Sequence, residues 1–307
     1  MDNTRSYLAL LLIALFLGIP GTIFAQAGSS GMAFLKLGPS ARGTAMGDAT
    51  AAWITGADAV YYNPAGLLSN DGSAELMFVH REWIQDTRME HLAAAFPIGQ
   101  ATALGLSVSA LSVSDIEIRT RPGPPDATFT ARNISIAASY AQRFGDDLRV
   151  GGTAKYLYEK ILVDDASGFA FDLGAQWDLN AAGISVGAIL ANLGRMGNLR
   201  DERTSLPANL RIGPATSFDF EDLHSTARVA ADLQYVLPDS RVYLNIGGEF
   251  LYDETLALRS GYQFGSGARG YTGGIGIRYA ILQVDYAYAP LSYDLGDSHT
   301  IGVLVRF

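Results

Sequence analysis

The stretch Gly270-Tyr271-Thr272-Gly273-Gly274-Ile275-Gly276-Ile277-Arg278-Tyr279 alternates between two kinds of side chain with a period of two. A period of two is the geometry of a β-strand, in which successive side chains point to opposite faces of the sheet. One face is apolar with an aromatic residue near each end, and the other is small and polar. This pattern is typical of a strand that crosses a membrane as part of a barrel. The apolar face carries Tyr271, Gly273, Ile275, Ile277 and Tyr279.

The two segments that follow repeat the pattern up to the end of the sequence. In residues 281–289 Leu282, Val284, Tyr286 and Tyr288 share the apolar face, opposite Gln283 and Asp285. In the last segment Ile301, Val303, Val305 and Phe307 share one face, opposite Thr300, Gly302 and Arg306. An aromatic residue at the end of such a strand is expected to act as the signal that the barrel assembly machinery reads, so Phe307 is the predicted assembly signal.

Working back toward the amino terminus, about fourteen such segments can be counted, separated by turn residues. An even number places both ends of the barrel on the periplasmic side, as single-chain bacterial outer-membrane barrels require. The predicted fold class is therefore all-β, a transmembrane barrel of about fourteen antiparallel strands. The first and seventh segments alternate poorly. The segments start near Ala74, Arg88, Ala101, Arg132, Leu148, Phe169, Gly183, Ala208, Ser225, Arg241, Thr255, Gly270, Ile281 and Ser298.

Composition favours the same class over a water-soluble β-sandwich. Of the 307 residues 34 are Gly, and only 17% are charged. The net charge of −9 argues against a nucleic-acid surface, because binding phosphates requires clustered Lys and Arg. The absence of Cys excludes a disulfide framework and a thiolate metal site. No cofactor is expected.

The amino terminus reads as a cleaved signal peptide, residues 1–27. Arg5 supplies the positive charge, the run from Leu8 to Leu17 is apolar, and Ala25-Gln26-Ala27 offers the small residues of a cleavage site. An uncleaved anchor is the alternative, but the apolar run is shorter than the roughly 20 residues that a spanning helix needs. The expected location is the outer membrane of a Gram-negative bacterium, in contact with its lipids.

Residues 28–72 show little alternation and precede the first strand. They are rich in small residues and carry helix punctuation, such as Ser40 before a short apolar run and Pro64 after Tyr61-Tyr62. A fourteen-strand barrel needs filling, because about eight strands already use the space that side chains can occupy. The sequence thus predicts a plug at 28–72 and a barrel at 73–307.

The faces opposite the apolar ones should line the lumen, and their charges nearly balance. A near-neutral lumen does not resemble an electrostatic filter, which is built from rings of like charge. Pairing of neighbouring charges, such as Glu249 with Arg259 or Arg278 with Asp285, is favoured over substrate contact. The positive residues are Lys155, Arg211, Arg228, Arg259, Arg278 and Arg306, and the negative ones are Glu159, Asp172, Asp232, Glu249 and Asp285.

Three other motifs have a structural explanation that outweighs a functional one. The spacing of glycines in 265–270 matches a dinucleotide-binding loop, but strands on both sides make a hairpin turn the better interpretation. Ser298 and His299 could belong to an outer-membrane lipid hydrolase, although nothing supplies a third group, and an enzyme is not expected. Asp58 and Asn63 are expected to cap turns.

The segments Phe34–Ala49 and Ala59–Leu67 resemble the amino-terminal signature of the PorV/PorQ family, which is similar to the wider group of FadL-like outer-membrane barrels. The residues that carry the resemblance are the plug motif Arg42, Gly43, Met46, Gly47, Asp48, Asn63, Pro64, Ala65 and Gly66. The resemblance implies a fourteen-stranded barrel with an amino-terminal hatch.

Two functions follow from this resemblance. The first is an accessory or shuttle role in type IX protein secretion, with the secretion translocon and the C-terminal domains of cargo proteins as partners. The alternative is a FadL-type channel that admits a hydrophobic small molecule past the hatch. The chain leaves little room for long loops, and this favours the compact shuttle.

Overall fold

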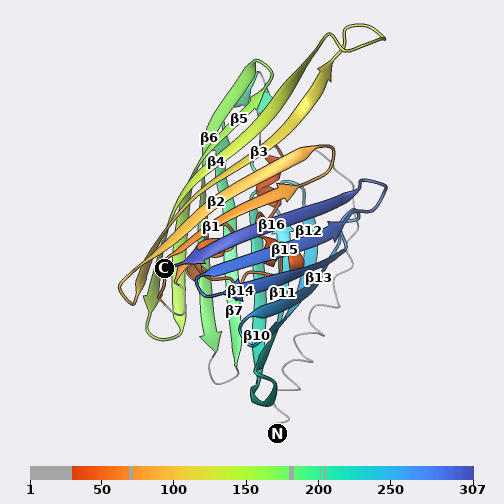
Figure 1. Cartoon of the computed structure of the whole chain (residues 1–307). Coiled ribbons are helices and arrows are strands. Elements are labelled where there is room, and N and C mark those ends of the chain that lie inside the picture. Colours follow the sequence, from red (N-terminus) through yellow and green to blue (C-terminus); the bar gives the residue numbers. More distant parts are fainter. Residues whose placement is uncertain (1–29, 69–71, 180–182, 201, 204) are drawn as a thin grey trace.

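The computed structural model describes residues 30–68, 72–179, 183–200, 202–203 and 205–307, so the expected signal peptide lies outside the described residues. The described residues form a closed antiparallel barrel of fourteen strands, with short helices at the amino-terminal end (Figure 1). The predicted fold class is confirmed. No helix among the described residues is long and apolar enough to cross a membrane.

The strands that form the barrel follow one another around it in sequence order. They are β1 (Glu75–Glu82), β2 (Thr87–Ile98), β3 (Thr102–Ile118), β4 (Ala127–Phe144), β5 (Leu148–Ile161), β6 (Asp164–Leu179), β7 (Ile184–Met196), β10 (Asn209–Phe220), β11 (Ser225–Val236), β12 (Arg241–Tyr252), β13 (Leu256–Phe264), β14 (Tyr271–Tyr279), β15 (Leu282–Pro290) and β16 (Asp297–Arg306). The short strands β8 (Asn198–Leu199) and β9 (Glu202–Arg203) pair only with each other.

The barrel closes where β1 pairs with β16, with Glu75 opposite Arg306. Phe307 continues this pairing by one residue, because its N–H donates to the Ala74 carbonyl at 3.0 Å and its carbonyl accepts from the Ala74 N–H at 2.9 Å. The terminal aromatic residue therefore lies at the seam of the barrel. Its side chain is exposed on the outer face.

The two longest connections lie at the same end of the barrel, as antiparallel pairing requires. They are residues 119–126 between β3 and β4, and residues 197–208, which contain the β8–β9 hairpin. The β3–β4 hairpin extends well beyond the neighbouring strands (Figure 1). β4 and β6 each begin five residues earlier than the alternation suggested, at Ala127 and Asp164.

The outer and inner faces of the wall differ as the alternation predicts. Large apolar side chains such as Phe78, Leu106, Phe169 and Ile277 are exposed on the outside. The inside encloses residues 30–68, which we call the hatch and which Figure 1 shows in red and orange within the barrel. Its helices are η1 (Ala33–Lys36), α2 (Ala41–Ala45), η2 (Gly56–Asp58), α3 (Ala59–Tyr62) and η3 (Pro64–Leu67), while η4 (Glu221–Leu223) is a turn between β10 and β11.

Candidate functional site

The candidate site is the lumen, where the hatch meets the wall. The hatch buries nearly all of its side chains, although it has only short helices. Ser40 directly precedes helix α2, and its hydroxyl accepts a hydrogen bond from the Gly43 N–H at 3.2 Å. This is the usual N-terminal cap, which satisfies a donor that the helix leaves unpaired. The chain then turns sharply through Gly47 and Asp48, both in the left-handed region with φ of 65° and 61°.

Asn63 holds the second half of the hatch. Its amide donates to the carbonyls of Ala51 at 2.8 Å and Ala175 at 3.2 Å, and its oxygen accepts from the Ala65 N–H at 3.2 Å. Pro64 then starts η3 in a position where the missing N–H has no cost. Asn63 therefore caps η3 as expected, and it also attaches the hatch to β6. Asp58 makes no such cap, because its side chain accepts nothing from the following backbone.

Seven inward-facing glycines of the wall make room for the hatch, and we call them the glycine ring. A Cβ atom at Gly174 would lie 2.0 Å from the Asn63 side-chain oxygen, and one at Gly187 would lie 2.0 Å from the Ala51 carbonyl oxygen. Real Cβ atoms do not approach other atoms so closely, so the hatch lies directly against the strands, and its backbone makes the contact at Gly151, Gly187, Gly247 and Gly261. The ring consists of Gly105, Gly151, Gly174, Gly187, Gly247, Gly261 and Gly274.

Asp48 is the most connected carboxylate of the hatch. It is buried and accepts hydrogen bonds from the Tyr62 hydroxyl at 3.1 Å and from the guanidinium of Arg269. Burial would raise the pKa of Asp48, but the positive charges of Arg269, Arg211 and Arg81 outweigh it, and the pKa is lowered. Asp48 is therefore ionised and binds the hatch to the β13–β14 connection, which carries Arg269.

Arg211 and Asp232, two of the predicted lumen charges, hold the same turn from the wall. Arg211 donates to the Asp48 carbonyl at 3.1 Å and to the Thr50 hydroxyl at 2.9 Å. The Asp232 carboxylate accepts from the N–H groups of Thr50 at 2.6 Å and Ala51 at 2.9 Å. Both charges thus satisfy polar groups of a segment that has no regular secondary structure.

From another part of the hatch, Arg42 extends to a network of charged residues of the wall. It forms an ion pair with Glu249 at 3.2 Å, and Glu249 also pairs with Arg228 at 2.6 Å and Arg259 at 2.7 Å. Arg259 in turn reaches Asp285 at 2.6 Å. The predicted pair of Glu249 with Arg259 is present. Asp285 of β15 pairs with Arg259 of β13, and Arg278 lies on β14 between these two strands.

Trp53 lies between two of these arginines. The guanidinium carbons of Arg42 and Arg228 are 4.5 Å and 5.3 Å from the centre of its ring. The positive charge faces the electron-rich face of the indole, which is a favourable contact.

Lys155, Asp172 and Asn192 form a third group. Lys155 pairs with Asp172 at 2.6 Å and donates to Asn192 at 2.8 Å. Asn192 has a φ of 60° and sits at a register shift between β6 and β7, where its N–H donates to Asp172 at 2.7 Å. Such a bulge redirects a side chain, and here it turns the amide of Asn192 into the lumen.

The remaining predicted residues also face inward. Arg306 pairs with Glu75 at 2.9 Å, Glu159 is buried in the wall of β5, and Arg278 lines a cavity beside Arg42. Gly43 and Met46 are buried in and after α2. A Cβ atom at Gly66 would lie 2.1 Å from the Ile54 carbonyl oxygen, so this position also requires a close approach.

Several residues that hold the hatch were missed by sequence reasoning. Glu75 accepts from the Ala57 N–H at 2.8 Å, Arg81 donates to the Gly38 carbonyl at 2.6 Å, and Gln176 donates to the carbonyls of Ala51 and Ile54 at 3.1 Å. Arg269 lies in a connection, where alternation carries no information. Glu75 and Arg81 could have been predicted, because both lie at alternate positions of the first strand and therefore on the same face of it.

The pair Ser298 and His299 does not form a catalytic arrangement. Ser298 is buried and its hydroxyl contacts Arg81 at 3.1 Å and the Glu82 carbonyl at 2.9 Å. His299 lies on the other face of β16 and contacts the Tyr286 hydroxyl at 2.8 Å. Neighbours in a strand point in opposite directions, so their closeness in sequence does not bring the two side chains together. The glycines of 265–270 form the turn between β13 and β14.

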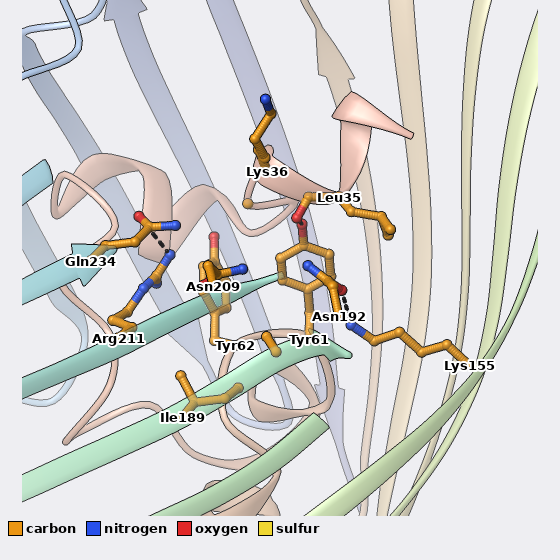
Figure 2. A pocket seen from close by; sticks show the side chains of 12 residues that line it. Leu35, Lys36, Tyr61, Tyr62, Lys155, Ile189, Asn192, Asn209, Arg211 and Gln234 are labelled. Carbon is orange, nitrogen blue, oxygen red and sulfur yellow. Dashed lines mark hydrogen bonds between the residues drawn. The ribbon is translucent and has the colours of Figure 1, made fainter. Parts of the chain in front are cut away.

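Cavities lie on both sides of the hatch. One is bordered by Tyr61 and Tyr62 together with Lys155 and Arg211 (Figure 2). A second is bordered by Trp53 together with residues near the opposite ends of the strands, among them Arg149 and Ser185. A third adjoins Arg42. The hatch lies between the first cavity and the other two.

This architecture is similar to that of solved hydrocarbon channels. The monoaromatic hydrocarbon channel CymD matches with a TM-score of 0.61 at 15% sequence identity, over 88% of this chain and 96% of that chain. The toluene transporter TodX of Pseudomonas putida matches with a TM-score of 0.61 at 14% identity, over 88% of this chain and 97% of that chain. The chain shares the barrel fold of these two channels.

At this level of identity the likeness concerns the fold alone. No protein-family model matches the sequence, and no curated protein matches it. The two structures compared are described as a monoaromatic hydrocarbon channel and a toluene transporter. A membership in the PorV/PorQ family specifically, which the plug motif suggested, is not shown by these comparisons.

Proposed function

We propose that this protein is a channel of the outer membrane of a Gram-negative bacterium that admits small hydrophobic molecules past its hatch. The observation that carries the proposal is the position of the hatch, which separates a cavity beside Tyr61 and Tyr62 from cavities beside Trp53 and Arg42. The FadL-like fold supports it, since CymD and TodX are described as a hydrocarbon channel and a toluene transporter.

The outer face of the barrel supports the membrane location. Its exposed side chains include Leu106, Phe169, Leu173 and Ile277, each with more than half of its surface accessible. Soluble proteins rarely expose so extensive an apolar surface, whereas a barrel in lipid requires one. Outer-membrane lipids and the barrel assembly machinery are therefore the partners that we assign to this surface and to Phe307.

The secretion role has less support. It rested on the plug motif, and the residues of that motif are used in docking the hatch: Gly47 approaches β13, Asn63 bonds to β6, and Arg42 pairs with β12. They form no exposed surface that could receive a cargo domain. The motif therefore supports the presence of a hatch and gives no support to a secretion partner.

The proposal is tested by locking the hatch. A Cβ atom at Gly302 would lie 3.7 Å from that of Ala41, close to the spacing of about 3.8 Å found in disulfides. Because the chain has no Cys, the double variant Ala41→Cys/Gly302→Cys introduces a single pair. The part of toluene uptake by whole cells that is lost when the protein is deleted is expected to stop on oxidation and to recover on reduction.

Each single-Cys variant serves as the matched control and should import toluene under both conditions. If the oxidised double variant, with its disulfide verified by mass spectrometry, imports as fast as the reduced one, movement of the hatch is not required. If the wild-type protein does not import toluene or longer hydrocarbons at all, the channel proposal fails.

A further inference from the structure

Arg132 of β4 and Lys160 of β5 lie directly opposite each other on the outer face of the barrel, and both side chains are exposed. They share this face with Ile136 and Tyr156, which are exposed four positions further along the same two strands. Side chains of directly opposed residues start only about 5 Å apart, so two like charges in such positions destabilise the pairing of the strands.

No carboxylate of the chain resolves this contact. Among the described residues neither Arg132 nor Lys160 lies within ion-pair distance of an acidic side chain. Asp165 of β6 lies opposite Lys160 on its other side, but it forms no ion pair with it and could offset only one of the two charges. The two cations thus suit an anion from outside the chain.

The other end of the same two strands shows how a similar contact is resolved within the chain. There Arg143 of β4 lies opposite Arg149 of β5. Arg149 is buried and pairs with Asp178 of β6 at 2.8 Å, so an internal carboxylate supplies the negative charge. The pair on the outer face has no such partner among the described residues.

Arg132 and Lys160 lie just beyond the apolar band of the outer face. The outward residues of β4 from Phe144 to Ile134 are mostly apolar, and these two residues are ten positions apart. At about 3.3 Å per residue and a strand tilt of about 40°, this length corresponds to about 25 Å along the barrel axis, which is the height of the apolar band of an outer-membrane barrel. Arg132 is the next outward residue after Ile134 and is therefore level with the lipid headgroups.

The pair lies at the end of the barrel that carries the longest connections. β4 follows the connection 119–126, and the β3–β4 hairpin extends beyond the neighbouring strands at this end (Figure 1). The long connections of such barrels face the outside of the cell. Aromatic side chains also mark a membrane interface, and the ring of Tyr156 contacts that of Phe169 at 5.5 Å below Lys160. The headgroups beside the pair are therefore those of the outer leaflet.

We propose that Arg132 and Lys160 together bind a phosphate of a phosphorylated glycolipid of the outer leaflet, of the lipid A type. A guanidinium and an amino group supply charge-assisted hydrogen bonds to one phosphate, and its negative charge removes the repulsion between the two cations. The acyl chains of the same lipid lie along Ile136 and Tyr156. The inference rests on the outer-membrane location in the proposed function and adds to it one lipid class and the residues that hold its headgroup.

The test measures binding of lipid A to the purified full-length barrel in mixed micelles of an uncharged detergent, by microscale thermophoresis. The double variant Arg132→Gln/Lys160→Gln should bind at least roughly tenfold more weakly than wild type, because charge-assisted hydrogen bonds to the phosphate are lost. Arg121→Gln removes an exposed cation of the β3–β4 connection, beyond the end of β3, and is the matched control that should bind as wild type. Absence of binding by wild type, or equal binding by the double variant, would overturn the proposal.

Three further probes separate this lipid from other sources of phosphate. Lipid A from which the phosphates have been removed should bind at least roughly tenfold more weakly, because the anionic group is missing. Phosphatidylglycerol should bind more weakly than lipid A, and inorganic phosphate at the same concentration should displace little of it. If phosphatidylglycerol binds as tightly as lipid A, or if free phosphate displaces lipid A at equal concentration, the assignment of a glycolipid is wrong.

Arg132→Glu gives changes of opposite sign in stability and in binding. It replaces the repulsion with an attraction to Lys160, so the compact gel band should convert to the unfolded one at a higher temperature than in wild type when lipid A is absent. Lipid A should raise this temperature for wild type and leave it unchanged for the variant. A variant that is stabilised by lipid A as much as wild type would show that the lipid binds elsewhere.

The two proposals fail in different ways. If lipid A binds as described but cells lacking the protein take up toluene as fast as cells that have it, the lipid site stands and the channel is wrong. If uptake depends on the protein but the double variant binds lipid A as wild type does, the lipid site is wrong and the channel stands.

Discussion

The carboxylate of Glu75 lies 2.9 Å from Nε of Arg306, across the seam at which the last strand closes the barrel. The second oxygen of the same carboxylate accepts a hydrogen bond from the Ala57 N–H of the hatch at 2.8 Å. One buried side chain thus joins the first strand, the last strand and the hatch. Closing the barrel and docking the hatch therefore depend on a common residue.

Replacing Glu75 should destabilise both. We expect Glu75→Ala to lower the stability of the folded barrel by about 3 kcal/mol, because Arg306 loses its partner in a largely buried place. Glu75→Gln, which keeps an acceptor for Ala57, should cost less. The temperature at which the compact gel band converts to the unfolded one measures the effect. Glu82→Gln, at an exposed position of the same strand, should leave that temperature unchanged.

Phe307→Asp should prevent insertion into the membrane. Phe307 pairs with Ala74 at the seam and its ring lies on the outer face, where a carboxylate would have to enter lipid. The membrane fraction should then contain no heat-modifiable barrel, whereas Phe307→Tyr should insert normally. A normal amount of heat-modifiable Phe307→Asp protein in that fraction would show that the terminal residue is dispensable.

The glycine ring predicts a matched pair of alanine substitutions on neighbouring strands. Gly174→Ala would place a methyl group 2.0 Å from the Asn63 side chain, whereas Gly152→Ala finds no atom closer than 3.6 Å. We expect the first to cost about 1–3 kcal/mol and to expose the hatch to protease, because overpacking forces the backbone to move. The second should behave like wild type. Equal protease resistance of the two variants would mean that the hatch does not rest on β6.

Asp58 should make the docking of the hatch depend on pH. Burial raises the pKa of its carboxyl to about 6, against the opposing effects of the Ser40 hydrogen bond and the charge of Arg42, with Asp285 and Glu75 adding repulsion. The folded-state pKa lies above the usual 3.8, so the stabilisation is complete below that pH and is lost as the pH rises through 6.

Asp58→Asn removes this ionisation. The wild-type hatch should be more resistant to protease at about pH 5 than at about pH 7.5, by about 1–3 kcal/mol, and the variant should show a much smaller difference. A variant with the same pH profile as wild type would assign the effect to another group.

The strands could be predicted from the sequence wherever the lipid and the lumen require different side chains on the two faces of the wall. Residues 271–279 show this well, with Ile275 and Ile277 outside and Thr272 and Gly276 inside. The first strand alternated poorly for a physical reason that the structure supplies. Its inward residues Met77 and Val79 pack on apolar side chains of the hatch, so both faces are apolar.

The alternation of the seventh strand is interrupted for a different reason. The bulge at Asn192 shifts the parity of the residues that follow, so that Met196 faces inward where a regular strand would turn it outward. The candidate site was predicted only in part. Alternation placed Arg211, Asp232 and Glu249 in the lumen, but it could not pair them with hatch residues nearly two hundred positions away, nor could it find Arg269 in a connection.

The glycine ring also bears on the redesign of such a pore. Because the wall has glycine in place of larger side chains where the hatch contacts it, the shapes of the wall and of the hatch depend on each other. The glycine positions of this wall would not match a hatch taken from another barrel. A wall with larger side chains at these positions would clash with this hatch. Changing what passes through the barrel therefore requires the wall and the hatch to be redesigned together.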